Sequence, residues 1–108
     1  MNAAKKIEII DKIEATIAEI APSACTYSKY GGMVIEGFKS SNKSIIGGYF
    51  TYTKHISLEF SQGVKLKDSK GILLGNGKHR RHIKLICITD FTKYDCRTFL
   101  EQAFDLEA

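Results

Sequence analysis

The sequence predicts an α+β fold in which N- and C-terminal helices pack on one face of an antiparallel sheet of about four to five strands. Helical periodicity at both ends, strand-like segments between them, and short connections between successive strands lead to this expectation. The chain has 108 residues, 44% of them hydrophobic, which suits one domain over residues 1–108 with one core.

The first helix is expected over residues 3–20. Its isoleucines fall within one arc at about 100° per residue, while charged side chains occupy the opposite arc. The isoleucines of this arc are Ile9, Ile10, Ile13, Ile17 and Ile20. Pro22 lacks an N–H donor and pushes Ala21 out of helical geometry, so the helix must end there. We interpret the carboxylates of this helix as a solvated face, with a metal-binding ridge as the alternative.

Four segments have the composition or alternation of β-strands. They are residues 33–38, 44–52, 55–61 and 81–88. The third alternates most clearly, with Ile56, Leu58 and Phe60 on one face and polar side chains on the other, as in a half-buried antiparallel strand. Gly47 and Gly48, inside the second segment, predict a bulge or the close approach of another backbone.

Polar and glycine-containing segments separate these strands. Residues 31–32 and 39–43 are expected to form turns, because their residue types favour turns. Residues 25–30 are a short mixed segment without a clear assignment. Residues 62–74 are loop-like, with one helical turn at most.

A final helix is expected to begin at Asp90 or Thr92, either of which can serve as its N-cap. Asp95 then lies in the first turn, where the helix dipole favours a carboxylate. The apolar stripe of this helix comprises Cys96, Phe99, Leu100, Ala103 and Phe104.

The cysteines and the hydropathy pattern indicate an intracellular protein. Cys25, Cys87 and Cys96 form no C-x-x-C pair, which argues against a disulfide framework and a closed zinc site. We expect all three cysteines to be small buried hydrophobic residues, and burial is least expected for Cys25. The N-terminus lacks the apolar segment of a signal peptide, and no stretch of about 20 apolar residues is present. The expected location is the cytoplasm, without a membrane partner.

The positive charge of the chain is concentrated in one region. The net charge is +4, but residues 64–84 carry seven basic side chains against Asp68 alone, a local charge of +6. These basic residues are Lys65, Lys67, Lys70, Lys78, Arg80, Arg81 and Lys84. Such a distribution is typical of a basic patch on an otherwise ordinary domain.

The glycine-containing turn and strand at residues 75–85 are the strongest candidate site. A glycine turn exposes backbone N–H groups, and basic side chains beside it add charge-assisted donors, so the segment suits phosphate or carboxylate. The candidate ligand-binding residues are Gly75, Gly77, Lys78, Arg81, His82, Lys84 and His55. The alternative is a solvated edge strand, on which lysines discourage sheet aggregation. The segment is too short for a Walker loop and precedes a strand rather than a helix.

Two further arrangements depend on how the strands pair. If their strands are neighbours, His55 and His82 would lie near Glu59 as a weak metal or acid–base cluster. Arg81 is expected on the apolar side, where Glu36 or Asp90 is the candidate carboxylate partner.

Aromatic residues near the basic strands raise a nucleic-acid alternative. The residues are Tyr27, Tyr30, Tyr49 and Tyr52. Aromatic and basic side chains on one sheet form a platform for single strands, but the RRM signature is absent, and these tyrosines equally suit the rim of a core. We find no nucleophile with a base at a recognisable spacing and no cofactor fingerprint, so neither an enzyme nor a cofactor is expected.

Three segments, in this order, resemble the YdhG-like domains of unknown function. They are Y-S-K-Y-G-G at residues 27–32, K-H-I-S-L at 54–58, and G-N-G-K-H-R-R-H-I-K-L at 75–85. The resemblance implies a compact α+β domain, and some members are described as frataxin-like iron chaperones. This chain departs from that role, because iron delivery of that kind uses a dense acidic ridge and the first helix here mixes Lys5, Lys6 and Lys12 among its acids.

The leading expectation is a small intracellular binding module that contacts a small anionic ligand or an acidic protein surface through a basic strand edge. A frataxin-like metal carrier and a weak nucleic-acid binder are the alternatives. Nucleic acid is the less favoured partner.

Overall fold

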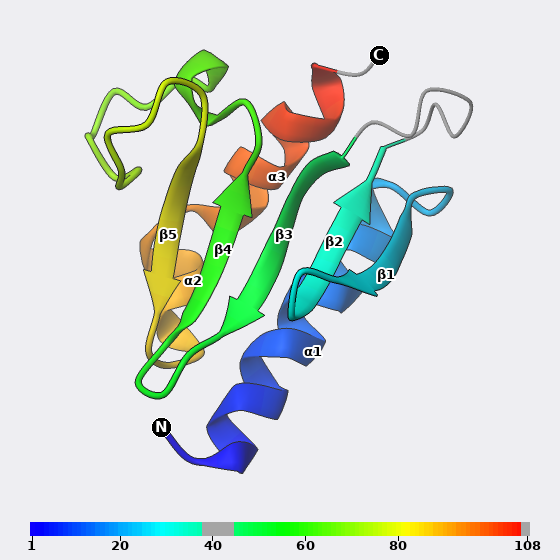
Figure 1. The fold of residues 1–108 in the computed structure, drawn as a ribbon, viewed down its shortest axis with the longest axis vertical. Coiled ribbons are helices and arrows are strands. Elements are labelled where there is room, and N and C mark those ends of the chain that lie inside the picture. The colour runs from blue at the N-terminus through cyan, green and yellow to red at the C-terminus, as the bar shows by residue number, and fades with distance from the viewer. Residues whose placement is uncertain (38–44, 107–108) are drawn as a thin grey trace.

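The computed structural model describes residues 1–37 and 45–106 of the chain. Within them, five antiparallel strands form one sheet in which each strand pairs with the next along the chain (Figure 1). The strands are β1 (Cys25–Lys29), β2 (Gly32–Glu36), β3 (Ile45–Thr51), β4 (Ile56–Phe60) and β5 (Arg81–Leu85). The helices are α1 (Ala3–Ile20), α2 (Thr89–Lys93), α3 (Cys96–Asp105) and the short 3-10 helix η2 (Gly63–Lys65). The predicted α+β class is confirmed.

Helix α1 covers the residues that its isoleucine periodicity predicts. Asn2 caps it, since the side-chain oxygen accepts a hydrogen bond from the Lys5 backbone N–H at 2.8 Å. At the other end, Ala21 leaves helical geometry with φ −147°, as expected for a residue before proline. The buried isoleucines are Ile9, Ile13 and Ile17. None of the helices in the described residues is long and apolar enough to cross a membrane.

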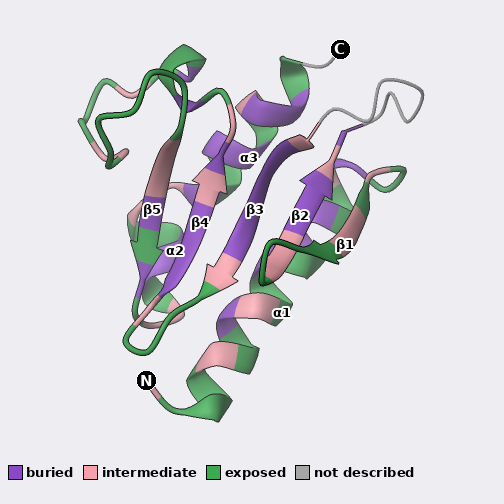
Figure 2. Ribbon diagram, in the orientation of Figure 1, coloured by how far each residue is buried: buried purple, intermediate pink, exposed green. Residues whose placement is uncertain are grey.

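The core lies between the sheet and the three helices, which all cover the same face (Figures 1 and 2). Its members include Ile13, Tyr49, Leu58, Ile83, Phe99 and Leu100. The Tyr49 hydroxyl donates a hydrogen bond to the Glu14 carboxylate on α1. Burial and this hydrogen bond raise the pKa of Tyr49, so the phenol stays neutral. Among the described residues no helix covers the opposite face of the sheet, which we call the outer face.

Strand alternation decides which side chains reach the outer face. Leu58 and Ile83 point into the core, so the residues on either side of them point outward. Opposite residues of an antiparallel pair share a face, and the register pairs Ser57 with Lys84 and Glu59 with His82. On β2 to β5 the outer face carries Val34, Gly48, Phe50, Ser57, Glu59, His82 and Lys84.

Strand β1 is formed by the segment that the sequence left unassigned. It pairs with β2 through a two-residue turn at Tyr30 and Gly31, whose φ angles are 58° and 78°. Positive φ at both positions is what a type I′ hairpin turn requires. Tyrosine is unusual in the first position, which explains why the hairpin is hard to read from the sequence.

The glycines of β3 fulfil both roles expected of them. After Ile35 pairs with Gly47, the register shifts and Ile46 is skipped in the pairing with β2, which is a β-bulge. A Cβ atom at Gly47 would lie 2.1 Å from the backbone oxygen of Glu59, so the neighbouring backbone also approaches closely. The prediction of a bulge or a close approach is confirmed.

Strand β5 is shorter than the expected strand at 81–88. It ends at Leu85, and the chain then turns around a carboxylate. One side-chain oxygen of Asp90 accepts hydrogen bonds from the backbone N–H groups of Ile86 at 2.8 Å and Cys87 at 3.2 Å. These two groups would otherwise continue the strand, so Asp90 fixes where β5 stops.

The expectation of one final helix capped by Asp90 or Thr92 is wrong. Helix α2 begins at Thr89, and Asp90 lies inside its first turn. Asp95 then adopts the left-handed region with φ 54°, which separates α2 from α3. Aspartate is one of the few non-glycine residues that tolerate this region. The expected apolar stripe of α3 is buried throughout: Cys96, Phe99, Leu100, Ala103 and Phe104.

The three cysteines differ in exposure. All are free thiols, with Cys96 buried, Cys87 partly buried and Cys25 exposed, so the expectation of burial is right for Cys96 and wrong for Cys25. Burial raises the pKa of Cys96 to about 12, which makes its thiol unreactive at neutral pH. The turn expected at residues 39–43 lies outside the described residues.

Candidate functional site

Strand β5 carries two basic side chains on the outer face. His82 lies directly opposite Glu59, and Lys84 lies opposite Ser57. On its other side, His82 exchanges two backbone hydrogen bonds with Leu74, at 2.8 and 2.9 Å. The segment at Leu74 therefore covers the first half of this sheet edge, and the strand is only partly a free edge.

His55 belongs to the same surface, although it lies in the connection before β4. Its ring stacks on Tyr52, with centroids 4.9 Å apart and an angle of 18° between the planes. Partial burial lowers the pKa of His55, and the positive charge of Lys84 and then His82 lowers it further. The structure thus brings His55, His82 and Lys84 together, as expected if β4 and β5 are neighbours.

We expect Lys84→Ala to raise the pKa of His55, because it removes a neighbouring ammonium that disfavours the protonated imidazole. In the wild type, His55 keeps its proton only at lower pH than an ordinary histidine, and the variant should move this transition to higher pH. A pH titration of the histidine ring signals by NMR measures the change. Lys70→Ala is the control, since Lys70 pairs with Asp95 at 3.6 Å on the helix side. An unchanged titration in Lys84→Ala would contradict the proximity of the two side chains.

The two histidines belong to no larger set of metal-ligating side chains in the described part of the chain. The described residues contain no group of three or more histidine, cysteine, aspartate or glutamate side chains placed to hold a metal ion. Glu59, opposite His82, accepts a hydrogen bond from the Ser57 hydroxyl at 3.1 Å. Its carboxylate is therefore held on the outer face between the two strands.

Arg81 does not present its charge on the outer face. It stands opposite Phe60, on the core side of the sheet, and its guanidinium donates hydrogen bonds of 2.6 Å to the backbone oxygens of Gly77 and Arg80. Neither carboxylate expected for Arg81 is its hydrogen-bond or ion-pair partner, because Asp90 binds the turn after β5 and Glu36 lies on β2. Arg81 instead closes the turn that leads into β5.

The two candidate glycines differ in what they contribute. Gly75 has φ +116°, which side-chain-bearing residues rarely adopt, so the turn needs glycine there. At Gly77 a Cβ atom would meet nothing closer than the Arg80 backbone oxygen at 4.0 Å. Lys78 lies beside Gly77 on a shallow depression that Arg80 also lines, so Lys78 is at the rim of the outer face.

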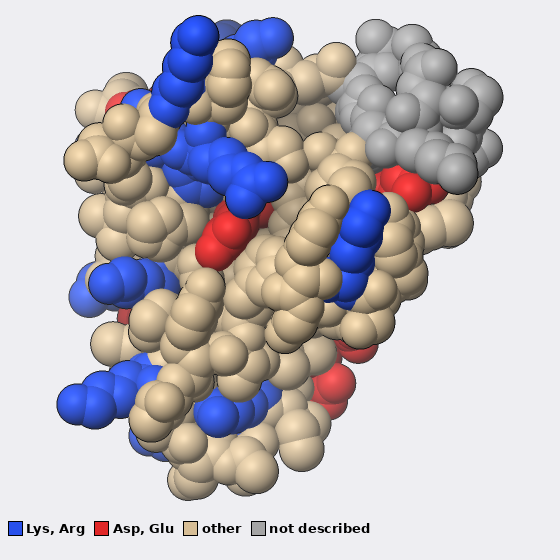
Figure 3. Space-filling view, viewed as in Figure 1, with Lys and Arg blue, Asp and Glu red and all other residues tan. Residues whose placement is uncertain are grey.

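The basic residues of 64–84 are divided between two sides of the molecule. Lys70 pairs with Asp95, and the backbone of Lys67 exchanges hydrogen bonds with the Gln102 side chain on α3, at 2.7 and 3.2 Å. Figure 3 shows the outer face, where most lysine and arginine atoms gather on the β5 side (left) with a carboxylate among them. The local charge of +6 is therefore not one continuous surface. On the outer face Lys84 lies close to His55 and His82, and we call these three residues the cluster.

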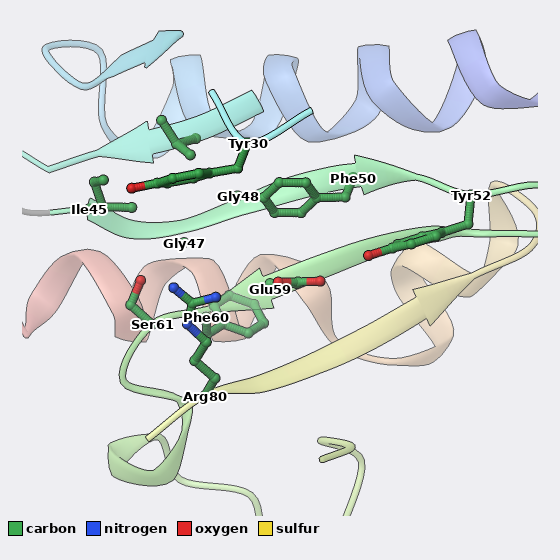
Figure 4. A pocket seen from close by; sticks show the side chains of 11 residues that line it. Tyr30, Ile45, Gly47, Gly48, Phe50, Tyr52, Glu59, Phe60, Ser61 and Arg80 are labelled. Carbon is green, nitrogen blue, oxygen red and sulfur yellow. The ribbon is translucent and has the colours of Figure 1, made fainter. Parts of the chain in front are cut away.

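A pocket of about 580 Å³ opens on the outer face beside this cluster, and we call it the trough. Its floor includes Gly47 and Gly48. Figure 4 shows the rings of Tyr30, Phe50 and Tyr52 along one side, and Glu59, Ser61 and Arg80 on the other. Arg80 points from the start of β5 into the trough. The cluster and the trough therefore share one surface.

Two glycines allow the ring of Phe50 to lie against the sheet. A Cβ atom at Gly32 would be 2.3 Å from Phe50 Cδ1, and one at Gly48 would be 3.0 Å from Phe50 Cε2. Tyr30 is 71% exposed because its turn carries it clear of the sheet, and the Lys29 ammonium lies 5.0 Å from its ring centroid. Glycine at positions 32 and 48 therefore makes room for the Phe50 ring on the aromatic side of the trough.

Sequence reasoning missed Phe50 as a site residue, and it counted Arg80 among the basic side chains of the segment without selecting it for the site. Strand alternation was the available signal for Phe50, since it places that ring on the same face as Lys84 once the register is known. Of the tyrosines near the basic strands, Tyr30 and Tyr52 line the trough and Tyr49 is buried in the core. No family model, curated protein or solved structure matches this chain.

Proposed function

We propose that this chain is a small non-catalytic binding module of the cytoplasm that captures an anionic ligand on the outer face of its sheet. The observation that carries the proposal is the gathering of His55, His82 and Lys84 on one open face, with Arg80 lining the adjoining trough. The likeness of three segments to YdhG-like domains bears on the α+β architecture and not on the ligand.

The chemistry of the cluster and of the neighbouring Arg80 suits phosphate or carboxylate. Arg80 offers a planar fork of donors, and Lys84 offers a compact positive charge. Within the described residues, neither Arg80 nor Lys84 forms an ion pair with a carboxylate. Each imidazole adds a ring N–H that can donate to an anion. The Glu59 carboxylate offsets one of the two positive charges of Arg80 and Lys84, so these three side chains together keep one positive charge.

Removing both cations is the direct test. We expect Arg80→Ala combined with Lys84→Ala to weaken binding of pyrophosphate about tenfold or more, because a charge-assisted hydrogen bond contributes roughly 1.5–3 kcal/mol. Isothermal titration calorimetry with inorganic phosphate and pyrophosphate at low ionic strength measures the affinity. The affinity of the wild type should fall as salt is added, because salt screens exposed charges.

The matched control is Lys67→Ala combined with Lys70→Ala. This control also removes two positive charges, but from the side of the molecule that faces Asp95 and Gln102. It should bind pyrophosphate as the wild type does. An equal loss in both double variants would mean that only net charge matters, and wild-type affinity in the first variant would mean that the outer face is not the site; either result overturns the proposal.

A further inference from the structure

The trough adds a second kind of chemistry to the cations beside it. Aromatic rings stand on one side, a glycine floor lies between, and a guanidinium stands on the other side (Figure 4). Inorganic phosphate has no planar surface that could stack on the exposed aromatic rings, and the Glu59 carboxylate repels its negative charge. A ligand that fills the trough should therefore carry a flat, uncharged part as well as an anionic part.

From this arrangement we infer that the ligand is a nucleoside phosphate, whose base enters the trough and whose phosphate meets Arg80 and Lys84. The inference rests on the proposed anion binding and names its ligand class. Planar bases stack on aromatic rings, and here the rings of Tyr30, Phe50 and Tyr52 stand along one side of the trough. The volume of about 580 Å³ lies within the usual range for small-ligand sites of roughly 300–1,000 Å³.

The register places the two parts of such a ligand at a workable separation. Gly48 on the floor lies opposite Glu59, and Glu59 lies opposite His82, so the three residues form one line across the sheet. Adjacent strands are about 4.8 Å apart, which puts roughly 10 Å between the floor and the imidazole side of the surface. Base, ribose and phosphate together bridge a separation of this order.

Glu59 gives the trough a preference among bases. Its carboxylate lines the trough and is oriented by the Ser57 hydroxyl at 3.1 Å. A carboxylate accepts hydrogen bonds and is suited to the exocyclic amino group of cytosine, whereas uracil offers an oxygen at the same position. CMP should therefore bind more tightly than UMP.

The experiment compares CMP, UMP, ribose 5-phosphate and inorganic phosphate by calorimetry with the intact chain. CMP should bind about tenfold or more tightly than ribose 5-phosphate, because stacking of one base is a substantial favourable term. Tyr30→Asn should remove most of this advantage and leave the phosphate affinity unchanged. Asparagine is chosen because it tolerates the positive φ at this position.

Two further variants sharpen the comparison. Tyr27→Ser removes an aromatic ring from outside the trough and should bind CMP as the wild type does. Glu59→Gln supplies a donor as well as an acceptor and should abolish the preference for CMP over UMP. Each variant is first checked for an unchanged melting temperature, so that lost binding is not mistaken for lost folding.

The outcomes separate this inference from the proposed function. Equal affinities for CMP and ribose 5-phosphate overturn the inference while phosphate binding through Arg80 and Lys84 still stands. Failure of all four ligands overturns both. A short single-stranded oligonucleotide that binds when no mononucleotide does also overturns it, since the ligand would then be a strand rather than a nucleoside phosphate.

Discussion

Gly47→Ala should lower the free energy of unfolding by about 3 kcal/mol, the upper part of the usual range for overpacking. A Cβ atom there would lie 2.1 Å from the backbone oxygen of Glu59, far inside van der Waals contact. Relief would require β3 and β4 to move apart, and their hydrogen bonds hold them together in the middle of the sheet. Rotation of a side chain cannot relieve the clash, because the atom it meets is backbone.

Thermal unfolding followed by circular dichroism measures this effect, and the expected fall in melting temperature is more than about 10 °C for a domain of this size. Gly77→Ala is the matched control, since a Cβ atom at Gly77 has open space and its φ is not in the left-handed region. The control should melt within a few degrees of the wild type, as most surface substitutions do. A Gly47 variant that melts together with the control would contradict the close approach of the two strands.

The parts of the fold that follow from short-range patterns could be predicted from the sequence. Helix α1 depends on isoleucine spacing and on the proline after it, so its bounds were right. The β3 glycines also carried a readable signal, because glycines inside a strand usually mean a bulge or a close neighbour. Strand β1 was missed because its turn needs positive φ at Tyr30, a residue that gives no turn signal. The break at Asp95 was missed because Asp95 was assigned to the first turn of one continuous helix, although aspartate tolerates the positive φ that it adopts.

Some residues of the candidate site could likewise be predicted from the sequence, and others could not. Alternation alone puts His82 and Lys84 on one face, and a meander brings His55 to them, so these three residues could be found without coordinates. The position of Arg81 could not, because its guanidinium is bound by the carbonyls of its own turn. The trough could not be found either, since it requires the register of three strands to bring Arg80 across from the aromatic rings.

The turn after β5 gives the second large expected effect. Asp90→Ala should lower the free energy of unfolding by about 2–3 kcal/mol, since hydrogen bonds to charged groups are each worth roughly 1.5–3 kcal/mol and some of the loss is recovered by water. Asp90 is 9% exposed, and its carboxylate accepts hydrogen bonds from the backbone N–H groups of Ile86 and Cys87, which lose their partner in the variant. Urea unfolding followed by circular dichroism gives the free energy directly.

Asparagine at this position distinguishes the hydrogen bonds from simple packing. Asp90→Asn can place a neutral oxygen where the carboxylate oxygen stood, so it should lose roughly half as much as alanine, because neutral acceptors are weaker. Asp105→Ala is the control for the loss of one carboxylate, since Asp105 is exposed at the end of α3. If Asp90→Ala were no less stable than Asp105→Ala, the turn would have another anchor.

The same turn fixes the end of the strand that carries His82 and Lys84, so Asp90→Ala should also weaken pyrophosphate binding at temperatures where the protein remains folded.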